Sequence, residues 1–222
     1  MYNTNISKEI LCWYDKNKRD LPWRKTNDPY KIWLSEVMLQ QTKVETVIPY
    51  YNNWLKNYKT IQSVAQANLD ELLKIWEGMG YYSRCKNFYH AAKEIIYKYN
   101  GTIPNQFDVF KSLPGVGDYI AGAVMSIAFN HPHPSIDGNH RRVISRILGI
   151  KNVSRYNKNR IYNYLKKIVE IDRPGDLNQA IMDIGSTICK PKEVFCDFCP
   201  VQFSCKACVS SKPLEYPNKI YN

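Results

Sequence analysis

The chain has 222 residues, enough to bury a core and to form one large domain or two small helical ones. Its formal net charge of +11, from 31 Lys and Arg against 20 Asp and Glu, favours a polyanionic partner. No apolar run approaches the roughly 18 residues that a membrane span needs, and the N-terminal segment MYNTNISKEI lacks the basic and apolar regions of a signal peptide. We therefore expect a cytoplasmic protein that contacts no membrane.

Seventeen tyrosines are interleaved with the basic residues. This combination suits nucleic acid, because rings stack on bases while cations neutralise phosphates. The alternative is a basic, tyrosine-rich surface without a specific partner. Five of the seven cysteines fall in the last 34 residues, a clustering that fits a metal or cluster site in a reducing compartment better than disulfides.

Apolar residues recur at helical spacing along most of the chain. In chain order, this pattern predicts helices over residues 5–16, 30–41, 43–58, 69–76, 105–112, 118–129, 140–148, 156–171 and 177–188. The proline-containing segment RDLPWRKTNDPY and the glycine-containing segment EGMGYYSRCKN interrupt the pattern, and both are predicted to be loops.

Both loops carry aromatic residues that could contact bases. Trp23 and Arg24, held in the first loop by prolines, are candidates for stacking on a base and hydrogen-bonding to it. The alternative is a buried tryptophan that anchors the loop beside a surface arginine. In the second loop Tyr81 is a candidate wedge into a base stack, with Arg84 and Lys86 holding phosphates, and an ordinary interhelical tyrosine is the alternative.

Glu36 lies on the predicted helix 30–41, and Gln40 shares its side of the helix four residues later. Trp33 and Met38 bring the apolar face close to this carboxyl group, which disfavours its charged form and should raise its pKa. A carboxyl group in such a setting is suited to act as a general acid near neutral pH. The alternative is an ordinary solvated glutamate.

Residues 113–139 combine a glycine hairpin, LPGVG, with an apolar helix and an aspartate on a turn. Gly115 and Gly117 can reach φ > 0 and expose N–H groups beside a helix N-terminus, which predicts a phosphate site; a plain helix–helix connection is the alternative. Asp137 could simply be the N-cap of the next helix. A phosphate-binding turn and a carboxylate, separated by one helix, are together what cleavage of a nucleotide's glycosidic bond requires. His140 is expected on the helix surface, or as a phosphate contact.

The C-terminal part contains the pattern C-x6-C-x2-C-x5-C, formed by Cys189, Cys196, Cys199 and Cys205. Four thiolates this close in sequence can surround one soft metal centre, and structural zinc and an iron–sulfur cluster are the two candidates. Cys208 is expected to be a spare thiol, while Cys12 and Cys85 are expected in the core.

The segments PWR, WLSEVMLQQT, WEGMGYY, LPGVG, DGN, QAIMDIG and the four-cysteine loop follow one another from about residue 21 to residue 205. In this order they resemble the catalytic region of MutY-type adenine DNA glycosylases, in the helix-hairpin-helix endonuclease III superfamily. The resemblance implies an all-α fold with two helical subdomains flanking a DNA-binding cleft. Residues 22–133 would form a six-helix domain with the hairpin, and residues 1–21 and 134–222 a discontinuous domain with a 4Fe-4S cluster.

The resemblance also implies catalytic roles. Glu36 would protonate the adenine at N7, and Asp137 would steady the sugar cation or attack its C1′ atom. Tyr119 stands where a bifunctional relative carries a lysine nucleophile, and Asn139 would orient the reactive centre. The implied DNA-contacting residues are Trp23, Arg24 and Asp183 near the flipped adenine, Gln40 in the space it leaves, Tyr81 as the wedge, and Gln41, Gly115 and Gly117.

The activity implied is that of a monofunctional glycosylase, active as a monomer, that excises mispaired adenine from double-stranded DNA in base excision repair. Base flipping and acid-assisted hydrolysis of the N-glycosidic bond would be its mechanism. Full-length relatives carry a C-terminal Nudix-like domain that helps recognise 8-oxoguanine, and the resemblance does not extend to it, so guanine and 8-oxoguanine both stay open as the opposite base. The alternatives are a T:G thymine glycosylase, an endonuclease III-like glycosylase/lyase and a non-enzymatic mismatch-binding protein.

Overall fold

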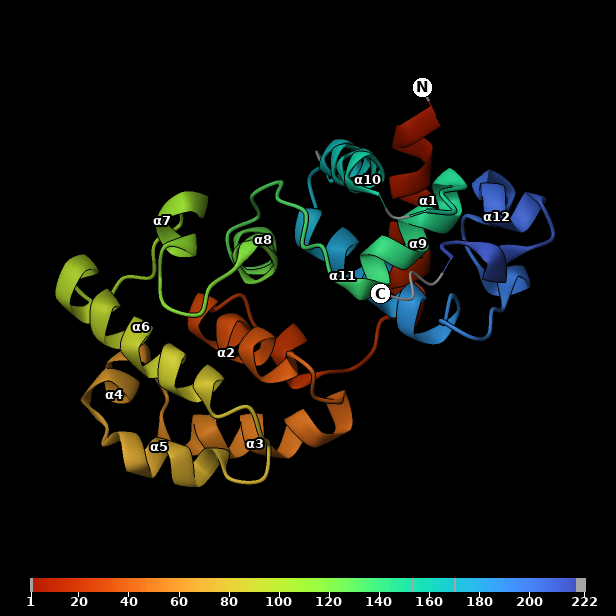
Figure 1. Ribbon diagram of the computed structural model, residues 1–222. Coiled ribbons are helices and arrows are strands. Elements are labelled where there is room, and N and C mark those ends of the chain that lie inside the picture. Colours follow the sequence, from red (N-terminus) through yellow and green to blue (C-terminus); the bar gives the residue numbers. More distant parts are fainter. Residues whose placement is uncertain (1, 153, 170, 219–222) are drawn as a thin grey trace. The chain divides into compact units, whose positions relative to one another are not determined.

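The computed structural model describes residues 2–152, 154–169 and 171–218 (Figure 1). These residues form twelve α-helices and four short 3-10 helices, and their only β-type pairing is one isolated bridge between Cys189 and Val194. The all-α prediction is confirmed. None of the helices in the described part is long and apolar enough to cross a membrane. The chain divides into two compact units, Asp20–Phe129 and Met1–Arg19 with Asn130–Asn222.

The unit Asp20–Phe129 is built around α2, which packs against α3, α6 and α8 (Figure 1). Residues 32–38 of α2 are buried on every side of the helix, as expected for an element surrounded by others. The helices of this unit are α2 (Pro29–Leu39), α3 (Val44–Asn57), α4 (Ile61–Gln66), α5 (Leu69–Trp76), α6 (Ser83–Tyr99), α7 (Phe107–Lys111) and α8 (Asp118–Ile127), with the 3-10 helix η1 (Pro22–Arg24) before them.

Two of these helices were not predicted from periodicity. The six-residue α4 is too short for a clear apolar pattern, but Thr60 and Ser63 form a reciprocal capping box at its start. The long α6 begins at Ser83, inside the segment predicted to be a loop, and ends at Tyr99, followed by the C-cap Asn100 in the left-handed conformation. Conversely, α2 ends at Leu39, so Gln40 lies outside the helix on which it was expected.

The core of this unit is rich in aromatic rings that meet edge to face. The Trp54 and Trp76 ring centroids lie 5.7 Å apart, and those of Trp33 and Phe110 lie 5.2 Å apart. Such pairs contribute about 0.5–1.5 kcal/mol beyond the burial of their area. This rigid core holds α2 and its side chains in place.

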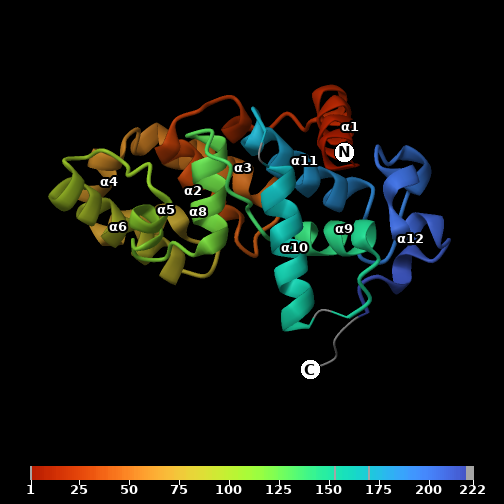
Figure 2. The same cartoon turned by 90° about the horizontal axis from the view of Figure 1, so that it is seen from above.

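The second unit contains the remaining helices, α1 (Tyr2–Asn17), α9 (Gly138–Leu148), α10 (Arg155–Ile168), α11 (Pro174–Thr187), α12 (Lys206–Val209) and the 3-10 helices η2 (Cys196–Phe198), η3 (Gln202–Ser204) and η4 (Pro213–Glu215). Buried α11 packs against α1 and α9, and Figure 2 shows α9 with α10 on one side and α12 on the other. A left-handed Gly149 ends α9. The helix that starts with Asp137 as its cap is therefore held by neighbours around it.

Candidate active site

Glu36 is buried inside the α2–α8 contact, with an exposed fraction of only 4%. The Tyr119 hydroxyl, on α8, donates a hydrogen bond of 2.6 Å to Glu36 Oε2. The solvated-glutamate alternative is therefore wrong. Because a buried carboxyl group favours its neutral form, this environment is suited to a proton donor. The hydrogen bond fixes the orientation of the carboxyl group, since both side chains come from packed helices.

Asp137 is the N-cap of α9, as the alternative interpretation held, and it also carries further hydrogen bonds. Its Oδ1 accepts from the His140 backbone N–H at 2.8 Å and lies 2.7 Å from His140 Nδ1. Its Oδ2 accepts from Asn139 Nδ2 at 2.7 Å. A cap needs only the first of these contacts. The other two show that its two neighbours hold both carboxylate oxygens in fixed positions.

These contacts decide the charge of Asp137. Burial alone would raise its pKa, but the hydrogen bonds from His140 and Asn139, and the positive charge of His140 when protonated, outweigh burial. The net effect holds the pKa of Asp137 below its ordinary value. Asp137 is therefore an anion at neutral pH.

Arg142 supports Asn139 from the next turn of α9, and the sequence interpretation did not identify it. Its Nη2 donates to Asn139 Oδ1 at 2.8 Å and to the Gly185 carbonyl at 2.6 Å, and its Nε donates to the Cys189 carbonyl at 2.8 Å. A Cβ atom on Gly185 would lie 2.6 Å from Asn139 Cβ, so only glycine fits there. The GNHRR run of α9 carried a signal, since Arg142 follows Asn139 by three residues, one helical turn.

Two of the predicted base contacts are buried. Asp183 has no exposed surface and forms an ion pair with Arg19, with 2.7 Å between Asp183 Oδ1 and Arg19 Nε. Trp23 is 6% exposed and packs edge to face on Tyr51, with ring centroids 5.4 Å apart. The structure matches the alternative in which Trp23 anchors the loop. Arg24, beside it, is partly exposed.

The glycine hairpin lies next to α6, and its two glycines differ. Gly115 has φ = +76°, and a Cβ atom there would lie 2.7 Å from Asn87 Cβ. Gly117 has φ = −97°, so the prediction of a left-handed conformation is wrong for it; it is the N-cap residue of α8, with open space around its Cα. Gly115 is the residue that lets the hairpin approach α6.

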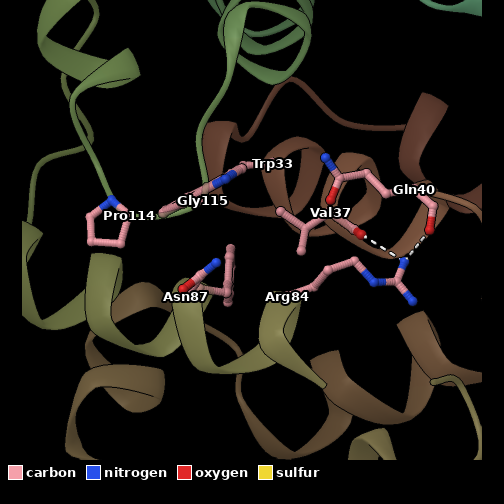
Figure 3. A pocket seen from close by; sticks show the side chains of 8 residues that line it. Trp33, Val37, Gln40, Arg84, Asn87, Pro114 and Gly115 are labelled. Carbon is pink, nitrogen blue, oxygen red and sulfur yellow. Dashed lines mark hydrogen bonds between the residues drawn. The ribbon is translucent and has the colours of Figure 1, made fainter. Parts of the chain in front are cut away.

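A small pocket opens beside this hairpin (Figure 3). It is lined by Trp33, Val37, Gln40, Arg84, Asn87, Phe88, Pro114 and Gly115. Arg84 donates to the carbonyls of Val37, Met38 and Gln40 at the C-terminal end of α2, where a positive charge is favourable. Arg84 is 8% exposed, so the expectation that it holds phosphates is wrong.

The proposed DNA-contacting residues at two other turns are exposed. Tyr81 is 56% exposed with φ = +50°, and Gln41 is exposed with φ = +57°. Gln40, which precedes it, is partly buried. Positive φ at residues other than glycine costs of order 1 kcal/mol and is concentrated at functional sites.

The four cysteines of the C-terminal pattern lie near one another and near N–H donors. The Arg146 guanidinium donates to Cys189 Sγ at 3.1 Å, and the backbone N–H groups of Val201 and of Ala207 donate to Cys199 and Cys205. Burial, together with the charge of neighbouring thiolates, raises the pKa of Cys199 to about 12. A cationic centre would relieve this cost. Among the described residues, no group of three or more His, Cys, Asp or Glu side chains is arranged to hold a single metal ion.

Three further expectations about single residues are corrected or met. His140 is fully buried, so its expected place on the helix surface is wrong. Cys12 is exposed, whereas Cys85 is in the core as predicted. Cys208 lies beside Cys196, and its role as a spare thiol outside the four-cysteine pattern stays a prediction.

Comparisons with known proteins show which family this chain resembles. A family model for "HhH-GPD superfamily base excision DNA repair protein" matches residues 34–171. The chain is 41% identical over 215 residues to an adenine DNA glycosylase of Rattus norvegicus, covering 92% of this chain and 42% of the rat protein. It is 40% identical over 220 residues to that of Buchnera aphidicola subsp. Acyrthosiphon pisum, covering 96% and 62%. A solved thermostable thymine-DNA glycosylase superimposes with a TM-score of 0.85 at 28% identity, covering 92% and 95%.

The chain thus spans less than two thirds of these two adenine DNA glycosylases and nearly all of the thymine-DNA glycosylase. The family model covers more than half of the chain and includes Glu36, the hairpin, Tyr119 and Asp137. With the all-α fold, this match identifies the chain as a member of the HhH-GPD superfamily of base excision DNA repair proteins.

Proposed function

We propose that this protein is a monofunctional DNA glycosylase that removes mispaired adenine from double-stranded DNA in base excision repair. The observation that carries the proposal is the buried Glu36 carboxyl group beside Tyr119, in a chain 40–41% identical to adenine DNA glycosylases. The net charge of +11 supports duplex DNA as the partner, because cations that neutralise phosphates release bound counterions.

Glu36 is the proposed general acid. Adenine is a poor leaving group until a ring nitrogen is protonated, and Glu36 would give its proton to N7 as the bond between C1′ and N9 breaks. Tyr119 offers no amine that could form a Schiff base with the sugar. The reaction therefore stops at release of the base, without strand cleavage.

Asp137 is the proposed partner of the sugar. Departure of the base leaves positive charge on C1′ and the ring oxygen, and an ionised carboxylate stabilises that charge. The three N–H groups of His140 and Asn139 keep Asp137 in this form. Water then bonds to C1′, and the proton it releases restores the acid form of Glu36.

Tyr81 is the proposed wedge into the DNA, Gln40 the proposed space-filling residue, and Gln41 a further proposed DNA contact. Exposure and positive φ support the roles of Tyr81 and Gln41, whereas Gln40 is partly buried. The exposed turn at Gly115, before α8, is proposed to bind a phosphate through its backbone N–H groups. The remaining predicted base contacts are less accessible. Asp183 and Trp23 are buried and Arg24 is partly exposed, so they would have to contact the base from these positions.

We also propose that Cys189, Cys196, Cys199 and Cys205 hold a 4Fe-4S cluster. Their spacing and the N–H donors beside three of the sulfurs support this assignment. When bound, the cluster supplies a rigid cross-link between segments of the unit. Iron, acid-labile sulfide and zinc measured per chain would test it, and one zinc without iron would select the zinc alternative.

Single-turnover release of free base from duplexes with A:G, A:8-oxoguanine and T:G pairs tests the activity. We expect adenine release, and a loss on the order of 100-fold or more in Glu36→Gln. Glu71→Gln, which changes an exposed glutamate of α5 in the same way, is the matched control and should keep the wild-type rate. A Glu36→Gln protein within tenfold of wild type would refute the role of Glu36.

The second candidate function is a T:G thymine glycosylase, which the structural match to a thymine-DNA glycosylase favours. Release of thymine from T:G, without release of adenine, would select it. Trapping of a covalent DNA adduct by borohydride would select a lyase, and binding of mismatched DNA without release of any base would select a non-enzymatic protein.

A further inference from the structure

His140 is a buried histidine in direct contact with the Asp137 carboxylate. Its side chain has no exposed surface, and its Nδ1 lies 2.7 Å from Asp137 Oδ1. Its other ring nitrogen, Nε2, is buried and has no hydrogen-bond partner among the described residues. A buried imidazole with a carboxylate at one nitrogen and no hydrogen-bond partner at the other has a defined orientation.

We infer that His140 is a positioning residue for Asp137, acting as a neutral imidazole whose Nδ1–H donates to Oδ1. The inference rests on the proposed role of Asp137 in the glycosylase reaction. His140 itself touches neither the base nor the sugar in this assignment. It acts by setting the charge and direction of the carboxylate.

The protonation state follows from the two ring nitrogens. A nitrogen 2.7 Å from a carboxylate oxygen must share a proton with it, because two acceptors at that distance repel each other. A doubly protonated ring would also bury an Nε2–H donor without an acceptor, which is more costly than burying an unpaired lone pair. The neutral Nδ1–H tautomer satisfies both conditions.

This arrangement gives the two oxygens of Asp137 different roles. Oδ1 accepts from two N–H groups of His140, while within the described part of the chain Oδ2 accepts one bond, from Asn139. The negative charge on Oδ2 is therefore less satisfied by the protein. We assign Oδ2 to the sugar cation and Oδ1 to anchoring the carboxylate.

Two substitutions separate the hydrogen bond from the volume of the ring. In His140→Asn, the side-chain amide N–H can replace Nδ1–H, whereas His140→Leu fills the space without a donor. We expect His140→Asn to stay within about threefold of the wild-type single-turnover rate and His140→Leu to lose on the order of tenfold or more. Affinity for the mismatched duplex should be unchanged in both. Equal rates for the two variants, whether both high or both low, would overturn the inference.

A second readout does not depend on catalysis. Nitrogen-15 NMR of the DNA-free protein, with the His140 signals assigned from the spectrum of His140→Asn, reports which ring nitrogen carries the proton. The expected result at neutral pH is a protonated Nδ1 and an unprotonated Nε2. A doubly protonated ring, or the opposite tautomer, would overturn the inference even if adenine is released. A wild-type protein that shows this tautomer but releases no base would instead contradict the proposed function.

Discussion

Glu36 and Asp137 carry the same functional group in opposite environments. The Glu36 carboxyl group is 4% exposed, and burial favours the neutral acid, while the Tyr119 hydroxyl fixes its orientation. Asp137 accepts three N–H hydrogen bonds, which favour the anion. A pair of carboxyl groups with opposed protonation states is what acid-assisted cleavage of a glycosidic bond requires.

The lowered pKa of Asp137 predicts the shape of the pH–rate profile. Its ordinary value is 3.8 and the folded value is lower, so Asp137 stays ionised at every pH above about 4. The stability that this group contributes is fully present above its unfolded pKa and is lost as pH falls through the lower folded pKa. We therefore expect that protonation of Asp137 causes no loss of the single-turnover rate from pH 7 down to about 5. A rate that falls between pH 7 and pH 5 would contradict this assignment.

At the scale of elements, the hairpin depends on one of its two glycines. Gly115→Ala introduces a Cβ atom 2.7 Å from Asn87 Cβ and strains a residue at φ = +76°. We expect it to lower the free energy of unfolding by about 1–2 kcal/mol and to weaken binding of duplex DNA. Denaturant unfolding and fluorescence titration with a labelled duplex measure the two effects.

Gly117→Ala is the matched control for that experiment. Gly117 has φ = −97°, and a Cβ atom added there would meet no other atom within 4 Å, so alanine fits without strain. Its stability should be unchanged or slightly higher, since alanine restricts the unfolded chain. Equal destabilisation by the two alanines would show that the contact with α6 is not what positions the hairpin.

At the scale of the whole molecule, the described residues form two separate hydrophobic cores, one in each unit. The cysteine loop belongs only to the second unit. Between α11 and α12 it contains short 3-10 turns, and Phe198 and Phe203 on it are 74% and 89% exposed. A segment made of short turns that also carries exposed aromatic rings depends in part on cross-links for its order.

Loss of the proposed cluster should therefore affect the two units differently. In Cys199→Ser we expect protease cleavage within residues 189–218 to be at least about tenfold faster, with residues 20–129 as resistant as before. Limited proteolysis followed by mass spectrometry measures both. Cys208→Ser, which removes a cysteine outside the proposed ligand set, is the control and should change neither region. Identical cleavage of Cys199→Ser and wild type would count against a structural role for the loop cysteines.

The sequence predicted the general plan of this protein because helices and their caps are local features. Each predicted helix between residues 30 and 188 overlaps an observed helix, and the predicted and observed bounds differ by a few residues. Asp137 at the start of α9 is an N-cap, which can be recognised from the residues next to it in the sequence. The spacing of apolar residues did not predict the short α4 or the start of α6. A capping box marks the start of α4 and a turn precedes α6, and neither feature shows apolar residues at helical spacing.

Burial and the partners of polar side chains were decided by the tertiary structure. The sequence by itself determined the all-α class, the cysteine spacing and the order of the family segments, since these depend on residue type and separation along the chain. Only the packing of helices decided that His140 is enclosed against Asp137, that Arg84 caps α2 and that Trp23 belongs to the core. The physical reason is that these contacts join residues that are brought together in space by the packing of helices. Their spacing in the sequence does not determine that distance.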